Sequence, residues 1–178
     1  MHNSNNKTQE PKVTAPRPTR EGQGGESVAL FPGSFDPFTR GHADIVQRGL
    51  RLFDRIMIAV GVNEQKKGWI PVEERVRALR ALYKDEPRVS VESYSCLTID
   101  FARQQGAQFI LRGLRTHKDY EYELGMADVN RQLDADIETV VLFTEADLAN
   151  ISSSVVRELA HFNHDIQPWL PEGLVYEL

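Results

Sequence analysis

The sequence predicts an α/β protein, a single domain built on a Rossmann-like, doubly wound sheet of five parallel strands. Short apolar runs alternate along the chain with segments of helical periodicity, which is the pattern of right-handed βαβ units. The apolar runs are nearly continuous, as expected for strands covered on both faces. A length of 178 residues, 40% of them hydrophobic, suits one domain with a real core.

The predicted strands are short apolar or β-branched runs. They span Val28–Phe31, Arg55–Val62, Val89–Tyr94, Gln108–Leu111 and Glu138–Phe143. Pro32 and Gly33 end the first strand. Each strand is followed by a segment with helical character, which completes the alternation on which the fold class depends.

The predicted helices connect and cover these strands. They span His42–Phe53, Val72–Tyr83, Thr98–Gln105, Lys118–Leu133 and Ser152–Phe162, with a short helical tail from about Pro171. In the first helix, apolar residues recur at 46, 50 and 53 and indicate its buried face.

Composition excludes several classes of function. The net charge of −5 argues against nucleic acid as the main partner, since such proteins usually carry a basic footprint. No apolar run approaches the length of a membrane span. Cys96 is the only cysteine, so no internal disulfide can form, and a cytoplasmic location is expected. Residues 1–26 are polar and are interpreted as a disordered extension, which leaves 27–178 as the domain.

Ligands of open parallel sheets bind beyond the carboxyl ends of the strands, so the post-strand segments are where a site is expected. The segment after the first strand contains Gly33, Gly41 and His42 and leads into a helix. Glycine lets backbone approach a phosphate closely, and a helix N-terminus offers free N–H groups. A strand-to-helix turn without a ligand is the alternative, but the length and composition of the segment favour a phosphate site.

Three other post-strand segments carry groups suited to anions. Lys66 and Lys67 follow the second strand, and Arg112 and Arg115 follow the fourth, where two arginines can hold phosphate oxygens bidentately. The serines at 152–154 begin a helix, where an N-cap and an anion site coincide. Solvated lysines and surface ion pairs are the alternatives, and the position of these groups at one sheet edge favours binding.

These motifs resemble the H-x-G-H nucleotidyltransferase superfamily, with Thr39 at the position of the first His and His42 at the last. The T-x-G-H variant is similar to the phosphopantetheine adenylyltransferases. So is the run that begins at Arg112, R-G-L-R-x(4)-Y-E-Y-E-x(6)-N-R. The lysine pair followed by E-E-R at Glu73, and I-S-S-S at Ile151, agree with the same family.

The resemblance implies three overlapping groups of site residues. The catalytic residues would be His42, Lys66 and Arg115. The phosphopantetheine-binding residues would be Ser34, Lys66, Thr98 and Arg112. The ATP-binding residues would be Ser34, Phe35, His42, Gly113, Leu114, Arg115, Glu123, Leu148, Ala149, Asn150, Ile151, Ser152, Ser153 and Ser154. Leu148-Ala149-Asn150 departs from the aromatic and polar segment usual in the family near the adenine.

The reaction that the resemblance implies is transfer of AMP from ATP to 4′-phosphopantetheine, which gives dephospho-coenzyme A and pyrophosphate. The attacking phosphate is already an anion, so no general base or covalent intermediate is required. No metal-ligand cluster is evident in the sequence, and Mg²⁺ is expected to arrive with ATP. The resemblance also implies a homohexamer and feedback by coenzyme A.

Two alternatives stay open. The chain could adenylylate a pyridine mononucleotide, against which Thr39 and the run from Arg112 argue. It could instead be a catalytically silent nucleotide-binding module or sensor. That alternative predicts loss of His42 or Lys66, and both are present.

Overall fold

The structure is a computed structural model that describes residues 25–63 and 68–177. Lys66, Lys67 and nearly all of the predicted extension, residues 1–26, lie outside the described residues. The strands are β1 (Val28–Gly33), β2 (Arg55–Gly61), β3 (Val89–Tyr94), β4 (Phe109–Leu114) and β5 (Glu138–Phe143). The helices are α1 (Arg40–Gly49), α2 (Val72–Leu82), α3 (Thr98–Gln104), α4 (His117–Leu133) and α5 (Ser153–His161), followed by the short 3₁₀ helix η1 (Gln167–Trp169).

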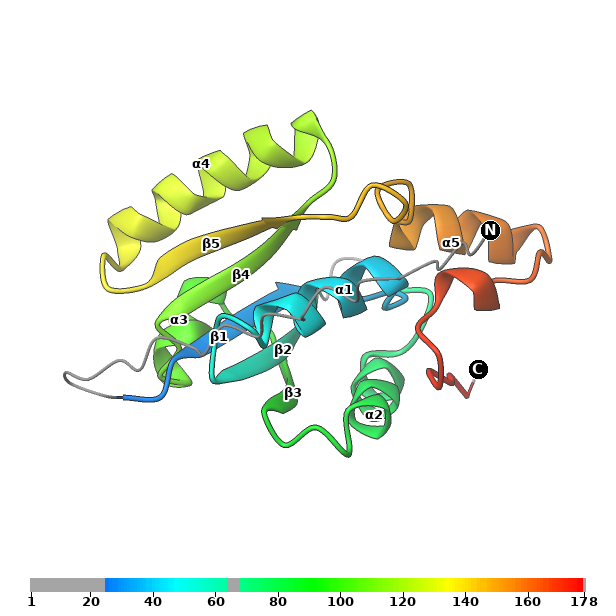
Figure 1. The fold of residues 1–178 in the computed structure, drawn as a ribbon, viewed down its shortest axis with the longest axis horizontal. Coiled ribbons are helices and arrows are strands. Elements are labelled where there is room, and N and C mark those ends of the chain that lie inside the picture. Colours follow the sequence, from blue (N-terminus) through cyan, green and yellow to red (C-terminus); the bar gives the residue numbers. More distant parts are fainter. Residues whose placement is uncertain (1–24, 64–67, 178) are drawn as a thin grey trace, which may run out of the picture.

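All five strands run parallel in the order β3-β2-β1-β4-β5, which confirms the predicted doubly wound sheet (Figure 1). The order reverses between β1 and β4. These two strands pair only at Ala29 with Phe109 and Leu30 with Ile110, while β1 and β2 pair along the whole of β1. The sheet therefore parts at its switch point toward the carboxyl ends, where ligands of such sheets bind.

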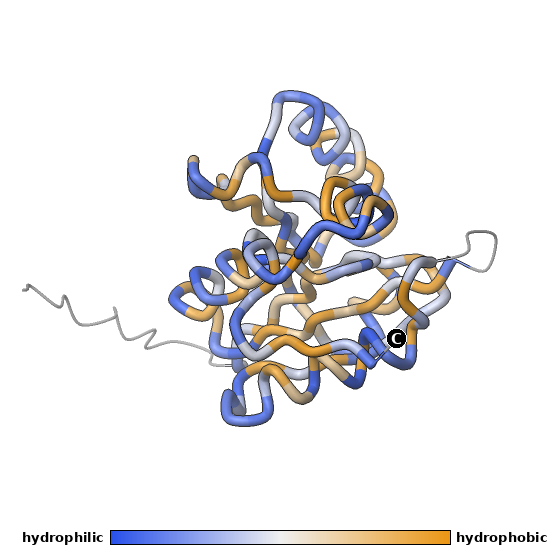
Figure 2. Tube along the Cα trace, turned by 90° about the vertical axis from the view of Figure 1, so that its right-hand side faces the viewer, coloured by the Kyte–Doolittle hydropathy of each residue, from blue (hydrophilic) through white to orange (hydrophobic). Residues whose placement is uncertain are grey.

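Two apolar clusters cover the sheet. The larger joins α1 and α2 to the sheet and to the C-terminal residues Leu170 and Leu174. The smaller joins α3, through Ile99 and Phe101, to Leu30 and Ile110. Figure 2 shows the hydrophobic strands enclosed between more polar segments. The core thus fixes the strand ends from both sides, as the apolar runs predict.

Helix α4 differs from the other helices. It lies along β4 and β5 (Figure 1), but its buried residues are the polar Glu123 and Asn130. Tyr120, Tyr122, Leu124, Met126, Val129 and Leu133 of this helix are exposed, as are Val141 and Phe143 of β5. Of these, the side chains at 122, 126, 129 and 133 follow helical spacing and form an exposed apolar face in the single chain, here called the outer face of α4. Tyr122 and Met126 of this face also border the cavities described below.

Two sequence predictions are wrong in detail. Strand β4 continues through Arg112 and Gly113 to Leu114, so these residues lie within the strand instead of following it. No helix begins at Pro171: after η1 the described chain turns at Gly173, whose φ is +80°, and continues irregularly. There the N–H of Glu177 donates to the carboxylate of Glu74 on α2, a contact that periodicity cannot reveal.

Candidate active site

Two cavities meet at the switch point. One, here called the α5 cavity, is about 370 Å³ and lies between the β1–α1 loop, β4 and the first residues of α5. The other, the α3 cavity, is about 450 Å³ and lies between the end of β3, the start of α3 and α4. Their shared wall consists of Pro32, Gly33, Ser34, Arg112, Tyr122 and Glu123. A molecule with two parts could therefore occupy both cavities at once.

His42 lines the α5 cavity from the first turn of α1. The backbone N–H of Thr39 donates to His42 Nδ1 at 3.0 Å, and the Thr39 hydroxyl lies 3.0 Å from the same nitrogen. Because Nδ1 accepts, the ring proton resides on Nε2. Thr39, at the position of the first His in H-x-G-H, thus sets the tautomer that makes Nε2 a donor.

The surroundings of His42 keep it neutral. Its ring lies 5.1 Å from the ring of Phe35 and 5.3 Å from that of Phe38, measured between centroids. Burial, together with the positive charges of Arg115 and Arg112, lowers the pKa of His42 to about 3. A neutral imidazole donates a hydrogen bond without carrying a charge, which suits a group that contacts a phosphate throughout the physiological pH range.

The loop between β1 and α1 is fastened by side chains from distant elements. Arg75 donates to the carbonyl of Ser34, and Arg157 donates to the carbonyl of Asp36. The Asp36 carboxylate accepts from the N–H groups of Trp69 and Ile70 at 2.8 and 2.9 Å. These contacts join the loop to α2, to α5 and to the segment just after residues 64–67, so the loop is held in one shape before any ligand binds.

Gly33 is required where this loop leaves the sheet. The ring of Phe35 folds back over it, and a Cβ at residue 33 would lie 2.8 Å from ring carbons. Phe35 has a φ of +49°, in the left-handed region that side-chain-bearing residues seldom adopt. Strained backbone of this kind clusters at functional sites. Gly33 is therefore the residue that lets Phe35 turn toward His42.

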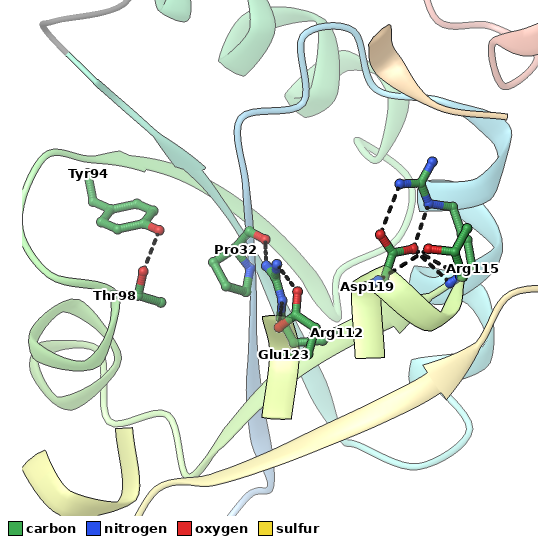
Figure 3. Close-up of polar contacts among 8 residues, drawn as sticks. Pro32, Tyr94, Thr98, Arg112, Arg115, Asp119 and Glu123 are labelled. Carbon is green, nitrogen blue, oxygen red and sulfur yellow. Dashed lines mark hydrogen bonds and ion pairs between the residues drawn. The ribbon is translucent and has the colours of Figure 1, made fainter. Parts of the chain in front are cut away.

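Arg112 stands in the wall between the cavities (Figure 3). Its Nε and one terminal nitrogen donate to the two carboxylate oxygens of Glu123, and its other terminal nitrogen donates to the carbonyl of Pro32 at 2.6 Å. Glu123 is only 8% exposed. A guanidinium has five N–H groups, so among the described residues two remain for a ligand. Glu123 thus orients Arg112, a role that the sequence did not reveal.

Arg115 lies at the other side of the α5 cavity (Figure 3). Its Nε is 3.4 Å from Asp119 Oδ2, and one terminal nitrogen donates to the carbonyl of Ile151 at 3.4 Å. Asp119 also accepts from the N–H of Thr116, the N-cap of α4. These long contacts hold Arg115 loosely, which leaves its guanidinium able to turn toward an anion.

Of the serines at the start of α5, Ser152 is the N-cap, and Ser153 and Ser154 are the first two residues of the helix. The Ser152 hydroxyl accepts from the N–H of Val155 at 3.2 Å, and the Ser153 hydroxyl donates to the carbonyl of Pro37 at 2.8 Å. The Ser154 hydroxyl accepts from Arg157 at 3.1 Å. Together with the helix N-terminus, these groups form a positive end to the α5 cavity.

The α3 cavity has a different character. The hydroxyls of Thr98 and Tyr94 form a hydrogen bond of 2.9 Å (Figure 3). The Tyr94 ring stacks on Phe101 at a centroid distance of 4.8 Å. Asn130 lines the cavity from α4 and is 8% exposed. Leu97 and further apolar side chains complete the lining. This combination suits a slender ligand that carries amides among methylene groups.

Most of the predicted site residues share these cavities. The α5 cavity is lined by Ser34, Phe35, His42, Arg112, Gly113, Arg115, Glu123, Ile151, Ser152, Ser153 and Ser154, and the α3 cavity by Ser34, Thr98, Arg112 and Glu123. Four predicted ATP contacts do not line either cavity. They are Leu114, which is buried in the protein, and Leu148, Ala149 and Asn150. The Leu148 carbonyl lies near Gly41 of α1 instead.

Several lining residues were not assigned to the site from the sequence, among them Arg157, Asn130 and Tyr122. Arg157 reaches the α5 cavity from the second turn of α5, and Asn130 and Tyr122 line the α3 cavity from α4. One signal for Arg157 was available, because a residue four positions after Ser153 lies on the same face of a helix. For Asn130 the available signal was its spacing of seven positions from Glu123, which places both on one face of the helix. The structure shows that these are the two residues that α4 buries.

Residues 30–159 match the family described as cytidylyltransferase-like, a span that begins within β1 and ends within α5. The chain is also 57% identical over 146 residues to the phosphopantetheine adenylyltransferase of Bacteroides fragilis, covering 82% of this chain and 97% of that one. To the corresponding enzyme of Porphyromonas gingivalis it is 49% identical over 152 residues, covering 85% and 99%.

A more distant relative agrees. The phosphopantetheine adenylyltransferase of Geotalea daltonii is 42% identical over 147 residues, covering 83% of this chain and 91% of that one. The chain therefore belongs to the phosphopantetheine adenylyltransferase family, a group of nucleotidyltransferases, as its motifs predict.

The described residues contain no helix that is both long enough and apolar enough to cross a membrane. They also contain no group of three or more His, Cys, Asp or Glu side chains arranged to hold a metal ion.

Proposed function

We propose that this protein transfers AMP from ATP to 4′-phosphopantetheine and releases pyrophosphate, a late step in coenzyme A synthesis. The observation that carries the proposal is the shared wall of the two cavities, in which Ser34 and Arg112 face both. ATP would occupy the α5 cavity, with its phosphates toward the positive end of α5. The pantetheine arm would occupy the α3 cavity. The reacting phosphates then meet at Arg112.

In this reaction an oxygen of the phosphopantetheine phosphate attacks the α-phosphorus of ATP in line. A new P–O bond forms as the bond to the β-phosphate oxygen breaks. Both reactants are anions, so the protein has to align them and stabilise the charge on the equatorial oxygens. His42 Nε2–H, held neutral and in the donor tautomer, would donate to the α-phosphate. In this role the His42 imidazole would neither gain nor lose a proton.

The positive groups divide into two sets. Arg112, oriented by Glu123, would hold the attacking phosphate with its two remaining N–H groups, assisted by the Ser34 hydroxyl. Arg115, Arg157 and the serine N-cap of α5 would hold the phosphates that leave. Lys66 would reach the reacting phosphates, but it lies outside the described residues, so its role stays a prediction from the sequence. The adenine contacts of residues 148–150 stay predictions as well.

Mg²⁺ is proposed to enter with ATP. It would neutralise the phosphates of the nucleotide and take mainly phosphate and water oxygens, as Mg²⁺ at nucleotide sites does. The polar side chains lining the α5 cavity are mainly arginines and hydroxyls, and its two carboxylates, Asp119 and Glu123, are engaged by Arg115 and Arg112. This lining fits a metal that the nucleotide carries. A cytoplasmic location also stays a prediction.

Feedback by coenzyme A and assembly into a homohexamer are also proposed. Coenzyme A carries an adenine nucleotide and a pantetheine arm in one molecule, so it could span both cavities and compete with both substrates. A homohexamer is proposed because α4 and β5 present apolar side chains to solvent, among them Leu124, Val129 and Phe143. Exposed apolar patches of this kind mark protein interfaces.

The test is a choice of acceptors. Purified protein is incubated with ATP, Mg²⁺ and either phosphopantetheine or nicotinamide mononucleotide, and pyrophosphate release is measured. Release is expected with phosphopantetheine and not with the mononucleotide. Equal or faster turnover of the mononucleotide would overturn the proposed acceptor, and no turnover of either would favour a silent nucleotide-binding protein.

A further inference from the structure

The peptide unit between Pro37 and Phe38 is held at both ends by residues distant in the sequence. Its carbonyl accepts a hydrogen bond of 2.8 Å from the hydroxyl of Ser153, the first residue of α5. Its N–H donates a hydrogen bond of 3.0 Å to the hydroxyl of Tyr176, which is 138 residues further along the chain. Two hydroxyls from separate elements therefore determine the plane of this peptide.

This peptide adjoins the one that controls His42. The next N–H along the chain is that of Thr39, which donates to His42 Nδ1. The Phe38 ring, fully buried, also packs against the imidazole at a centroid distance of 5.3 Å. A rotation of the Pro37–Phe38 peptide would therefore move the Phe38 ring that packs against His42. It would also move the backbone that carries the Thr39 N–H, the donor that sets the tautomer of His42.

Tyr176 is itself well anchored. Its ring packs against the main apolar cluster, and nearby Leu174 is buried. The N–H of Glu177 donates to Glu74 at 2.6 Å, and the Glu177 carboxylate pairs with Arg77 at 3.1 Å. Burial raises the pKa of Tyr176 to about 12, so its hydroxyl stays protonated at physiological pH. The C-terminal segment thus offers a fixed hydroxyl at a fixed place.

We propose that Tyr176 is a positioning residue for His42: its hydroxyl holds the Pro37–Phe38 peptide so that the Thr39 N–H meets Nδ1 and Nε2–H points into the α5 cavity. The inference rests on the role proposed above for His42. The competing interpretation is that Tyr176 only fastens the C-terminal segment to the core. The two interpretations predict different results for removal of one oxygen atom.

The first experiment compares Tyr176→Phe with Glu177→Gln. The phenylalanine keeps the ring in the core and removes the hydroxyl, while the glutamine weakens the ion pair to Arg77 and leaves the hydroxyl on Phe38. We expect Tyr176→Phe to lower kcat about tenfold, with KM for both substrates within about twofold, because His42 is proposed to act on the transition state. Glu177→Gln should keep its kcat. An unchanged kcat in Tyr176→Phe, or an equal loss in both variants, would contradict the proposal.

The second experiment asks whether the effect passes through His42. In a His42→Ala background, Tyr176→Phe should lower kcat by much less than tenfold, because the residue it positions is gone. The same loss in both backgrounds would show that Tyr176 acts independently and would overturn the proposal.

The third measurement does not depend on turnover. Nitrogen chemical shifts of the His42 ring should report the Nε2–H tautomer in the full-length protein and a mixture of tautomers in Tyr176→Phe. Because no substrate is present, this result separates a failure of the positioning idea from a failure of the proposed reaction. A single unchanged tautomer in the variant would sink the positioning role even if the wild type makes pyrophosphate as proposed.

Discussion

The loop of residues 34–39 and helix α4 border the same site but are held in opposite ways. The loop carbonyls of Ser34, Asp36 and Pro37 accept hydrogen bonds from three different side chains of α2 and α5. Helix α4 instead buries two polar residues and leaves its apolar side chains exposed. The comparison indicates that contacts within one chain suffice to shape the β1–α1 loop, whereas α4, which borders both cavities, is expected to need neighbouring chains.

The largest effect on catalysis is expected from the loss of His42, which follows this loop in the chain. His42→Ala should lower kcat about 10²–10³-fold, as loss of one transition-state donor typically does, while ATP affinity changes only a few-fold. Titration of ATP followed by single-turnover measurement separates the two quantities. A near-normal single-turnover rate, or a loss confined to ATP affinity, would reduce His42 to a helix-capping residue.

The two arginines test the division between the cavities. Arg112→Ala should mainly weaken binding of phosphopantetheine, and Arg115→Ala should mainly weaken binding of ATP, each about 10- to 100-fold, the range expected for lost hydrogen bonds to a charged group. Calorimetric titration of each ligand provides the measurement. Because Arg112→Ala also leaves Glu123 buried without its cation, Glu123→Gln serves as the control. Loss of the same ligand in both arginine variants would contradict the assignment.

The burial of His42 should also affect how the stability of the folded protein depends on pH. Its folded pKa of about 3 lies below the unfolded value of 6.5, so below pH 6.5 the unfolded chain binds more protons and the stability falls as the pH falls, down to about pH 3. Between pH 7.0 and 5.5 this one group should remove about 1 kcal/mol of unfolding free energy. Urea denaturation at both pH values should show that additional loss in the wild type and not in His42→Ala. Equal losses would mean that His42 is protonated in the folded protein.

The smallest effect on the site is expected from a substitution on the outer face of α4. Val129→Glu places a charge on its apolar outer face without touching either cavity, and should convert the proposed hexamer to smaller species in light scattering. Leu52→Glu, at a residue exposed after α1, should leave the particle mass unchanged. A wild type that is monomeric at micromolar concentration, or a Val129→Glu protein of unaltered mass, would remove the need for neighbouring chains.

The difference between local patterns and contacts of distant residues explains what could be predicted from the sequence. The strand and helix pattern, the sheet and the family followed from short-range patterns, because apolar runs and glycine turns report local burial and backbone geometry. The engagement of Arg112 by Glu123 and of Phe38 by Tyr176 did not, because hydrogen bonds between distant residues leave no periodic trace. The extension of β4 to Leu114 was missed because Arg112 and Gly113 are residues that ordinarily indicate a loop.

The hydrogen bond between Phe38 and Tyr176 affects when the site can form during synthesis of the chain. A chain is synthesised from its amino end, and domains fold as units as they emerge from the ribosome. The residues of the β1–α1 loop emerge early, but the Phe38 N–H finds its partner only when Tyr176 has been added. If Tyr176 positions His42 as proposed, a nascent chain that lacks the segment around Tyr176 already carries His42 but does not yet hold it in its final position. Catalytic competence would then follow the synthesis of that segment.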